Sequence, residues 1–399
     1  MTQTMMDPMQ PGGDRSPVLI GMETLLRKTD FPWSLVLIGE DQAGKLATLT
    51  GDLRRGVSTT GDGKRIPSGF SYLGTEPAIA WANACRDRLY PVMKQSIESF
   101  DLRWRSIRES LGGKPYHYVS LGPGDGQKDA VILQDLRRNN AQLYYVAVDM
   151  STEMLRLGVP ALIRGLNLSR SRVLSVQLDF SSKGNVVELR RVLNVLFGEE
   201  AVLFSLLGNT MTNFENDTEL LRMFAGQLLR PQDRFALEVA TTQQLDDSLA
   251  QEAAEEYGRS RTFREFVTSA LMHYTDLPID MDSVLFQGSV EEERALLIKF
   301  IYQNRTGRDI RITLPDRSSV SFPQWDTVRL GVSRKYMLDR LESLLAESGV
   351  QELASGHFDF DGGAPSGLGF GMALLVLAAD LETAGQGRSI PKNIWTKTS

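Results

Sequence analysis

The stretch YVSLGPGDGQKD, residues 118–129, is an apolar run that breaks into three glycines spaced two apart and then returns to helix-forming residues. The glycines are Gly122, Gly124 and Gly126. A strand that ends in glycines before a helix places backbone N–H groups and the helix N-terminus beside a ligand, with no Cβ to keep it away. The pattern therefore predicts a nucleotide-like cofactor at the end of a strand.

Short apolar runs alternate with amphipathic segments around this turn, from 117 to 242. The apolar runs are YHYVSL, LYYVAVD, RVLSVQLDF, AVLFSLL and RFALEVAT. Nearly continuous apolar strands separated by helices are typical of a parallel sheet that is buried on both faces. We therefore expect a doubly wound α/β domain over residues 114–242.

The flanking segments predict a second, discontinuous α+β lobe. Residues 66–111 and 243–274 have helical patterns, whereas four segments between 295 and 333 alternate like antiparallel strands. A helix is expected at 335–348, followed by a last buried strand, GLGFGMALLVLAAD, that returns to the core sheet. The expected division of the chain is a flexible arm at 1–17, the mostly helical part of the second lobe at 18–113, the core at 114–242, the lobe insert at 243–333 and the return to the core at 334–399.

Composition narrows the possible functions. The chain of 399 residues carries a formal net charge of −6 and a single cysteine, Cys85. Nucleic-acid binding depends on clustered Lys and Arg, so a nucleic-acid partner is not expected. One cysteine cannot form an intrachain disulfide and no cluster has metal-ligand spacing, which predicts a cytoplasmic protein without a metal site. No export signal or apolar run of roughly 20 residues is present, so no membrane partner is expected. The oligomeric state stays open.

The next two strands also end on residues suited to a nucleotide. YVAVDM ends on Asp149 and Met150, and Asp149 lies 23 positions after Gly126 (149 − 126). VQLDF ends on Asp179 and Phe180. A carboxylate after the second strand can accept both hydroxyls of a ribose, while an acid beside an aromatic ring can bind and cover an adenine. Ligands bind open α/β sheets at these carboxyl ends, so the three strands together predict one site.

The glycine spacing favours S-adenosylmethionine (SAM) over a dinucleotide. A dinucleotide site prefers its third glycine at the position of Gln127, whereas G-x-G-x-G suits an amino acid and a thioether. A nicotinamide-dependent oxidoreductase, which would use the same ribose acid, stays open as an alternative. Taken singly, Gly126 could be only a turn and Asp149 only a helix cap, although Ser151 could fill that role equally well.

Together, LGPGDGQKD, VAVDMS, LDF and LLGNTMTNFE resemble the histidine-specific SAM-dependent methyltransferase family, which includes the histidine Nα-methyltransferase of ergothioneine biosynthesis and the fungal dimethylallyltryptophan N-methyltransferase. The similarity is clearest over 118–242. It implies a Rossmann-like class I methyltransferase core that binds SAM and releases S-adenosylhomocysteine (SAH), with the second lobe enclosing the substrate. The resemblance places Gly122, Gly124 and Lys128 along the methionine part of SAM, Asp149 at its ribose, and Asp179 and Phe180 at its adenine.

A further motif carries the resemblance to the substrate. Family members usually have G-[ST]-T-I-G-N-[FL] after the fourth strand, and this chain reads GNTMTNF at 208–214. Gly208 and Thr210 are accordingly assigned to the cofactor site. The matching asparagine of the family holds the amino and carboxylate groups of an amino-acid substrate, which makes Asn213 the leading substrate ligand. Its alternative role is the N-terminal cap of a helix that begins near Asp217.

Two positions depart from the family pattern. The acid that often stands two before the first glycine is Ser120 here. Histidine methyltransferases also carry E-[IV]-S-x-K-[FY], whose glutamate and serine hold the imidazole. This chain reads GVSRKY at 331–336, so Gly331 replaces the glutamate while Ser333 is kept. Because a site built around a buried hydrogen bond discriminates by roughly 10⁴-fold or more in favourable cases, histidine is not the expected substrate.

The family also supplies tyrosines to the cleft from its N-terminal lobe, and Tyr72 and Tyr90 are the matching candidates. Each could equally be a half-buried tyrosine with a satisfied hydroxyl. Methyl transfer from a sulfonium to a neutral amine is an in-line displacement that needs placement rather than a covalent intermediate. A phenol can take the proton that the amine must lose, and Tyr72 is the candidate for this catalytic role.

The expected function is SAM-dependent N-methylation of an amino acid or an amino-acid-derived small molecule. The alternatives are O- or C-methylation of a small natural-product intermediate, nicotinamide-dependent oxidation, and a catalytically decayed SAM-binding regulatory protein. Ser120 and Gly331 favour the last alternative, whereas the intact Gly122, Asp149 and Asp179 speak against it.

Overall fold

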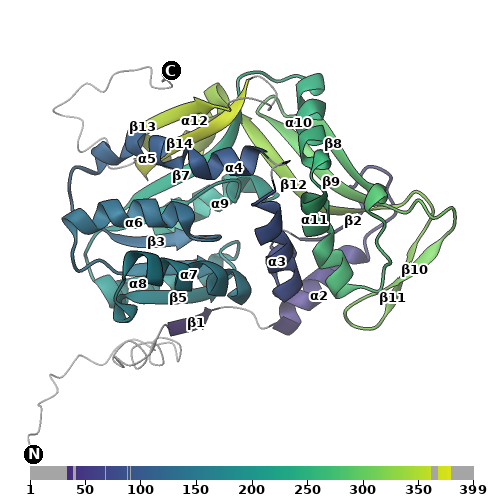
Figure 1. The fold of residues 1–399 in the computed structure, drawn as a ribbon, viewed down its shortest axis with the longest axis horizontal. Coiled ribbons are helices and arrows are strands. Elements are labelled where there is room, and N and C mark those ends of the chain that lie inside the picture. The colour runs from purple at the N-terminus through teal and green to yellow at the C-terminus, as the bar shows by residue number, and fades with distance from the viewer. Residues whose placement is uncertain are drawn as a thin grey trace, which may run out of the picture.

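The computed structural model describes residues 34–38, 42–67, 69–87, 89, 91–360 and 367–378. A mixed sheet runs through the molecule (Figure 1). Its parallel strands lie in the order β1 (Ser34–Ile38), β5 (Val173–Leu178), β4 (Tyr145–Asp149), β3 (His117–Leu121), β6 (Val202–Leu206) and β7 (Arg234–Thr242). The antiparallel β14 (Leu368–Leu377) follows β7 and pairs on its other side with β13 (Val350–Asp359).

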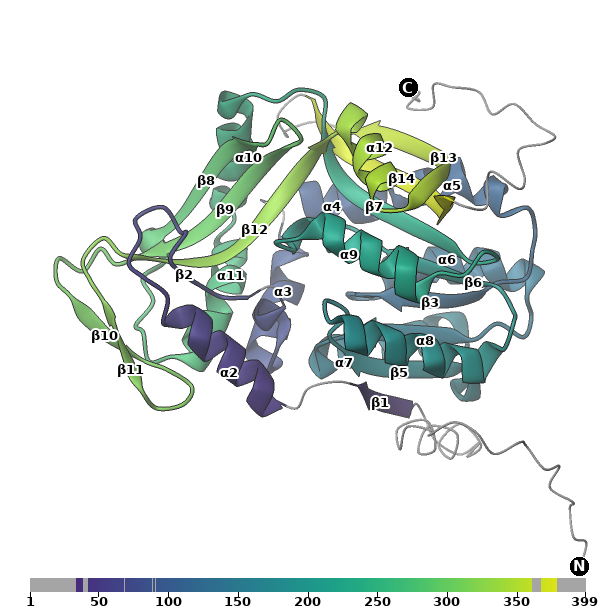
Figure 2. The same cartoon turned by 180° about the vertical axis from the view of Figure 1, so that it is seen from behind.

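Helices cover both faces of this core sheet, because its buried strands point apolar side chains alternately to either side. Tyr118 belongs to the apolar cluster of one face and its neighbour Val119 to that of the other. The first face carries α5 (Phe100–Arg108), α6 (Gln127–Asn139) and α7 (Thr152–Leu166), with α4 (Pro91–Glu98) preceding α5. The second face, seen in Figure 2, carries α8 (Lys183–Phe197), α9 (Asp217–Met223) and α12 (Leu338–Glu347). Short 3-10 turns are η1 (Phe70–Tyr72), η2 (Glu109–Leu111), η3 (Arg170–Arg172), η4 (Met211–Asn213) and η6 (Met281–Ser283), and η5 (Phe224–Leu228) is a π-helix.

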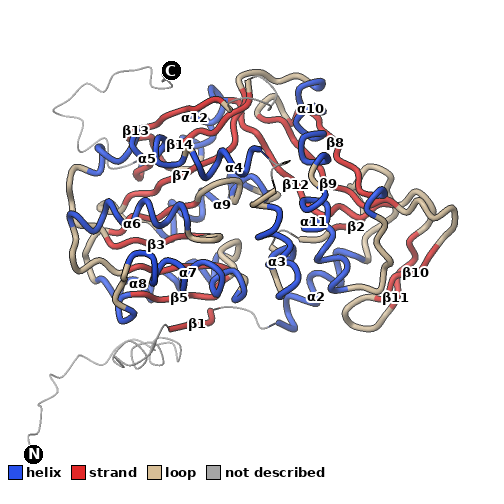
Figure 3. Tube along the Cα trace, viewed as in Figure 1, coloured by secondary structure: helices blue, strands red, loops and turns tan. Residues whose placement is uncertain are grey.

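The second lobe is built on an antiparallel set of strands flanked by helices (Figure 3). These strands are β8 (Val284–Glu291), β9 (Ala295–Gln303) and β12 (Thr327–Met337), and the short β2 (Lys64–Arg65) pairs with β12. The helices α2 (Gln42–Leu53), α3 (Thr75–Ala84), α10 (Asp247–Arg259) and α11 (Arg261–Tyr274) contribute to the same apolar core. The strands β10 (Ile310–Thr313) and β11 (Ser319–Phe322) pair only with each other.

The two lobes share one sheet. β7 is longer than β6, and its last residues, Thr241 and Thr242, pair with Tyr336 and Met337 of β12. The doubly wound α/β core and the discontinuous second lobe expected from the sequence are therefore confirmed. The shared strands hold the core and the lobe in register at the point where they meet.

Several local expectations differ from the structure. The helix expected at 335–348 begins at Leu338, because residues 335–337 complete β12. The strands β1, β2, β8 and β13 have no counterpart in the expectation. α5, expected in the second lobe at 18–113, packs on the core against β13 and β14, so we propose that the core begins near α4. The arm at 1–17 lies outside the described residues.

The described residues add two negative findings. Among the described helices, none combines the length and the apolar character that crossing a bilayer requires. Within the same part of the chain, no group of three or more His, Cys, Asp or Glu side chains is arranged to hold a metal ion.

Candidate active site

The ends of the core strands β3, β4, β5 and β6 meet the second lobe at a shared pocket. The core contributes the turns and loops that follow these strands, and the lobe contributes η1, α3, α10, α11, β9 and β12. The residues singled out by the sequence that line this pocket are Tyr72, Gly122, Gly124, Lys128, Asp149, Met150, Asp179, Phe180, Gly208, Thr210, Asn213, Gly331 and Ser333. Segments up to about 260 residues apart in the chain are therefore brought together, as expected for open α/β sheets.

One of the predicted residues does not line the pocket. Gly126 is not among its lining residues. It precedes α6 with a φ of 80°, and a Cβ at this position would lie 2.8 Å from Cδ1 of Leu162 on α7. A glycine is needed there for the turn and for the close approach of two helices. Tyr90 lies outside the described residues.

Trp81 of α3 covers the glycine turn and was not expected from the sequence. A Cβ on Gly124 would lie 3.1 Å from Cη2 of the indole. The turn thus presents its bare backbone to a wall from the second lobe, and Gly124 is needed because its φ is 58° and the space beside it is filled. No motif in the sequence connects Trp81 to this turn.

Asp149 ends β4 and is only 9% exposed. Its Oδ1 accepts a hydrogen bond from the backbone N–H of Ser151 at 2.8 Å. The cap of α7 is Ser151, whose hydroxyl accepts from the N–H of Met154 at 3.2 Å, so Asp149 is not needed as a cap. Burial raises the pKa of Asp149 to about 7, against the opposing effect of the N–H groups of Ser151 and Met150. A carboxyl group with a raised pKa in a pocket is a candidate ligand-binding residue, because hydrogen-bond donors from a ligand would stabilise its charged form.

Asp179 and Phe180 follow β5. The carboxylate of Asp179 accepts hydrogen bonds from the backbone N–H and the hydroxyl of Ser181, at 2.9 and 2.6 Å. Phe180 is buried, and its ring lies 5.7 Å from that of Phe214. Phe214 therefore joins the wall at which an adenine is expected.

Lys128 belongs to a buried ionic network that the sequence did not indicate. Its ammonium bonds the carboxylate of Glu238 and the hydroxyl of Ser96, the latter at 2.6 Å. Glu238, in the middle of β7, also accepts from Arg103 Nε at 2.7 Å and from the backbone N–H of Gly208 at 2.7 Å. Burial alone would raise the pKa of Glu238, but Lys128 and Arg103 outweigh it and hold the pKa below its usual value. Two cations facing one carboxylate leave net positive charge beside the pocket.

Asp129 supplies a buried carboxylate near the position where the family pattern has an acid and this chain has Ser120. Its Oδ1 accepts from the hydroxyls of Tyr118 and Ser120, at 2.8 and 3.0 Å, and its Oδ2 accepts from Tyr145 at 2.6 Å. Burial raises the pKa of Asp129 to about 6, although these hydroxyls favour its ionised form. The carboxylate is therefore provided by α6 rather than by β3.

Asn213 and Tyr72 meet at the other side of the pocket. The Asn213 amide nitrogen donates to the Tyr72 hydroxyl at 3.4 Å, and the Tyr72 ring lies 5.3 Å from that of Phe266. The cap residue of α9 is Asn216, so the alternative role of Asn213 as that cap is wrong. Burial raises the pKa of the Tyr72 phenol well above its usual value, so the hydroxyl stays protonated at neutral pH.

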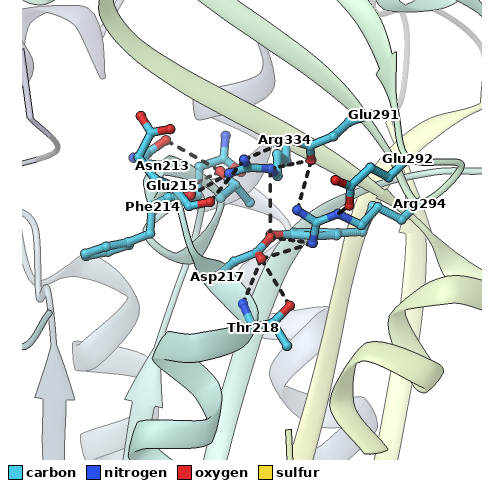
Figure 4. Close-up of polar contacts among 12 residues, drawn as sticks. Asn213, Phe214, Glu215, Asp217, Thr218, Glu291, Glu292, Arg294 and Arg334 are labelled. Atoms are coloured by element: carbon cyan, nitrogen blue, oxygen red, sulfur yellow. Dashed lines mark hydrogen bonds and ion pairs between the residues drawn. The ribbon is translucent and has the colours of Figure 1, made fainter. Parts of the chain in front are cut away.

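The loop that carries Asn213 is fixed to the second lobe by Arg334 (Figure 4). The guanidinium of this buried residue donates to the carbonyl of Phe214 at 2.5 Å and to the carboxylate of Glu291 at 2.6 and 2.9 Å. It also lies 3.8 Å from Asp217, which Arg294 binds at 3.0 Å. Because Arg334 follows Ser333 in β12, its side chain couples this strand to the loop that carries Asn213.

The fold and the site are those of a class I SAM-dependent methyltransferase. Their shared features are a glycine turn after β3, acidic residues after β4 and β5, and an antiparallel strand beside β7. The chain belongs to the histidine-specific SAM-dependent methyltransferase family, whose model matches residues 50–357. It is a SAM-dependent methyltransferase, and SAM is its cofactor. The donor set fits that molecule, since bare backbone, a buried cation and buried carboxylates lie in one pocket.

Solved structures with a similar fold include a SAM-dependent methyltransferase from Clostridium acetobutylicum ATCC 824, with 13% identity, 71% of this chain and 91% of that chain covered, and a TM-score of 0.37. Magnesium protoporphyrin IX methyltransferase from Synechocystis PCC 6803, with bound SAH, shows 10% identity, 77% and 96% coverage and a TM-score of 0.37. A glycopeptide N-methyltransferase shows 17% identity, 68% and 94% coverage and a TM-score of 0.31. No curated protein sequence matches the chain.

Proposed function

We propose that the protein methylates the amine of an amino acid or of a small molecule derived from one. The observation that carries this proposal is the position of Asn213. It lies on the same loop as Gly208 and Thr210, which line the pocket beside the glycine turn, and its amide is oriented by Tyr72. An amide held in this way can bind the amino and carboxylate groups of an amino acid next to the methyl donor.

The cofactor residues are assigned by their chemistry. Asp149 would accept hydrogen bonds from the two ribose hydroxyls, and Asp179 with Phe180 would bind the adenine. Gly122, Gly124 and Lys128 would hold the methionine part, whose carboxylate is matched by the excess positive charge of the network that Lys128 and Arg103 form with Glu238. When bound, SAM supplies an electrophilic methyl group on a positively charged sulfur.

The chain's own task is to present a neutral nitrogen lone pair opposite that sulfur. Because the pocket excludes water on its apolar side, it lowers the pKa of an entering amine and selects the neutral form. Tyr72 is protonated, so we assign it as a hydrogen-bond partner of Asn213 rather than as the proton acceptor expected from the sequence. The rings of Phe263 and Phe266 line the same pocket and can stabilise the cationic product by cation–π attraction.

The experiment is an incubation of the protein with SAM and single amino acids, followed by mass spectrometry of the products. We expect a product heavier by one or more methyl groups, whose fragments place the methyl on nitrogen. The Asn213→Ala variant should bind SAH as wild type does and should lose most of the transfer. Methyl groups found on oxygen or carbon would support the O- or C-methylation alternatives instead, and SAH binding without transfer to any amine would support a decayed enzyme.

A further inference from the structure

The part of the pocket formed by α10, α11, β9 and β12 is apolar. The apolar side chains that line it are Phe263, Phe266, Val267, Phe300, Leu330 and Val332. Its hydroxyl groups, from Tyr257 and Ser333, bond each other at 3.1 Å. Among the described residues, every charged side chain that lines the pocket comes from the core, and none comes from these four elements.

Gly331 stands where the resembling histidine enzymes have a glutamate, and the space beside it is taken. β12 pairs with β9 so that Gly331 lies opposite Phe300, directly after a register shift between Arg329 and Gly331. A Cβ on Gly331 would lie 3.3 Å from Cδ2 of Phe300. The Phe300 ring therefore fills the space that a longer side chain at position 331 would need.

The Phe300 ring is held in place by its neighbours. It is 6% exposed, and its centroid lies 5.2 Å from those of Tyr257 and Phe263 and 5.7 Å from that of Phe286. Three rings packed at these distances around Phe300 restrict its rotation, since interiors are close-packed and few rotamers fit. The apolar character of this wall is thus a fixed property of the site.

We propose that the acceptor amine belongs to a molecule with an uncharged, apolar side group, such as an aromatic ring or a branched alkyl chain, and that Gly331 and Phe300 select this group. This inference rests on the proposed methylation of an amino acid or its derivative. An imidazole or a guanidinium against this wall would lose its water and would meet no charged partner among the described lining residues of these four elements. The hydroxyls of Tyr257 and Ser333 already bond each other, whereas an apolar group gains from leaving water. The cost is largest for a charged group, because a charge that is buried without a charged partner is strongly disfavoured.

The test is a calorimetric titration of the SAH-saturated protein with L-phenylalanine, L-leucine, L-histidine and L-arginine. These probes share the amine and the carboxylate and differ only in the side chain. We expect the dissociation constant of L-phenylalanine or L-leucine to be at least tenfold lower than that of L-histidine and of L-arginine. Binding of L-histidine or L-arginine as tight as that of the apolar probes, or no detectable binding of any of the four, would overturn the proposal.

A substitution at Gly331 tests whether the apolar wall formed by Gly331 and Phe300 contacts the acceptor. Gly331→Ala brings a methyl group against Phe300, so the dissociation constant of the tighter apolar probe should rise at least fivefold while that of SAH stays unchanged. Gly51→Ala, on α2 with open space around it, is the matched control and should change neither constant. Equal affinity of the apolar probe for wild type and Gly331→Ala would contradict the assignment.

The two proposals fail separately. Methylation of an apolar amino acid on its carboxylate would contradict the proposed N-methylation and leave the side-group assignment standing. Methylation of the L-histidine amine in preference to that of the apolar probes would support N-methylation and overturn the side-group assignment.

Discussion

Asp149 shows how burial at a single residue tunes the cofactor site. In the role proposed for it, the carboxylate is ionised and accepts hydrogen bonds from two ribose hydroxyls, while burial raises its pKa to about 7. Binding of SAH in this role would therefore be coupled to the loss of a proton from Asp149, and the affinity for the cofactor would depend on pH in the neutral range.

We expect the dissociation constant of SAH to rise as the pH falls from 8 to 6, approaching about tenfold per pH unit below 7. Calorimetry at three pH values measures this. In Asp149→Asn the affinity should be weak and nearly independent of pH in this range. Asp129, whose pKa is about 6, affects only the lower end of the range, and the asparagine variant separates the two carboxyl groups. A constant affinity in the folded wild-type protein would contradict the role of Asp149.

Tyr72 gives a second prediction at this scale. Because its phenol is already protonated at neutral pH, Tyr72→Phe should raise the KM of the acceptor several-fold by releasing Asn213, and it should leave the shape of the pH–rate profile unchanged. Steady-state kinetics from pH 6.5 to 9 checks both. The loss of one limb of the profile in the phenylalanine variant would show that Tyr72 accepts the proton after all.

Sequence motifs predict some residues of the pocket and not others. That Asp149, Asp179 and Asn213 line one pocket could be predicted, because they follow strands at fixed places in a known pattern. Glu238 could not, because a buried carboxylate in the middle of an apolar strand is explained only by Lys128 and Arg103, which come from helices distant in the chain. Gly126 belongs to the same motif but does not line the pocket, and its lack of a side chain allows the close packing against Leu162.

At the scale of elements, Arg334 joins β12 to the loop after β6. Arg294 is a matched control for Arg334, because both arginines form buried or half-buried ion pairs with Asp217 and Glu291. Removing one partner of a buried pair costs about 3–5 kcal/mol, so Arg334→Met and Arg294→Met should lower the melting temperature by comparable amounts.

Of these two arginines, Arg334 donates to the carbonyl of Phe214, the residue that follows Asn213, and Arg294 does not. Arg334→Met should therefore raise the KM of the acceptor by roughly tenfold, the effect of losing one hydrogen bond to a charged group, while the affinity for SAH is kept. Arg294→Met should leave that KM near the wild-type value. Thermal unfolding and steady-state kinetics give the comparison, and identical KM changes in both variants would show that Arg334 acts through stability alone.

Helices and strands could be predicted where the order of apolar and polar residues within the segment itself indicates them. The core strands are continuous apolar runs, and β9 to β12 alternate clearly. β13 was missed because VQELASGHFD is largely half-buried and carries no clear alternation. Lys335, the first residue of the expected helix, lies instead in β12, where it is fully buried and the rings of Tyr257 and Phe360 lie 5.4 and 5.9 Å from its ammonium.

In the whole molecule, one sheet carries strands of both lobes that line the pocket. The pairing of β7 with β12 places Gly331 and Ser333 across the pocket from the ends of β3 and β4. The sequence predicted that the core strand ends converge, since parallel strands share one edge. It could not predict the shared sheet, because a pairing such as Thr241 with Tyr336 joins segments far apart in the chain and leaves no local pattern.

The central claim is that these strand ends form one SAM site enclosed by the second lobe. The most direct measurement is calorimetric titration of SAH into the wild-type protein, Asp149→Ala and the control Asp135→Ala, whose carboxylate lies on α6 against Trp104 and Arg108. Losing two hydrogen bonds to a charged group predicts roughly 100-fold weaker binding for Asp149→Ala, and wild-type affinity for Asp135→Ala. Equal SAH affinity in wild type and Asp149→Ala would contradict the account.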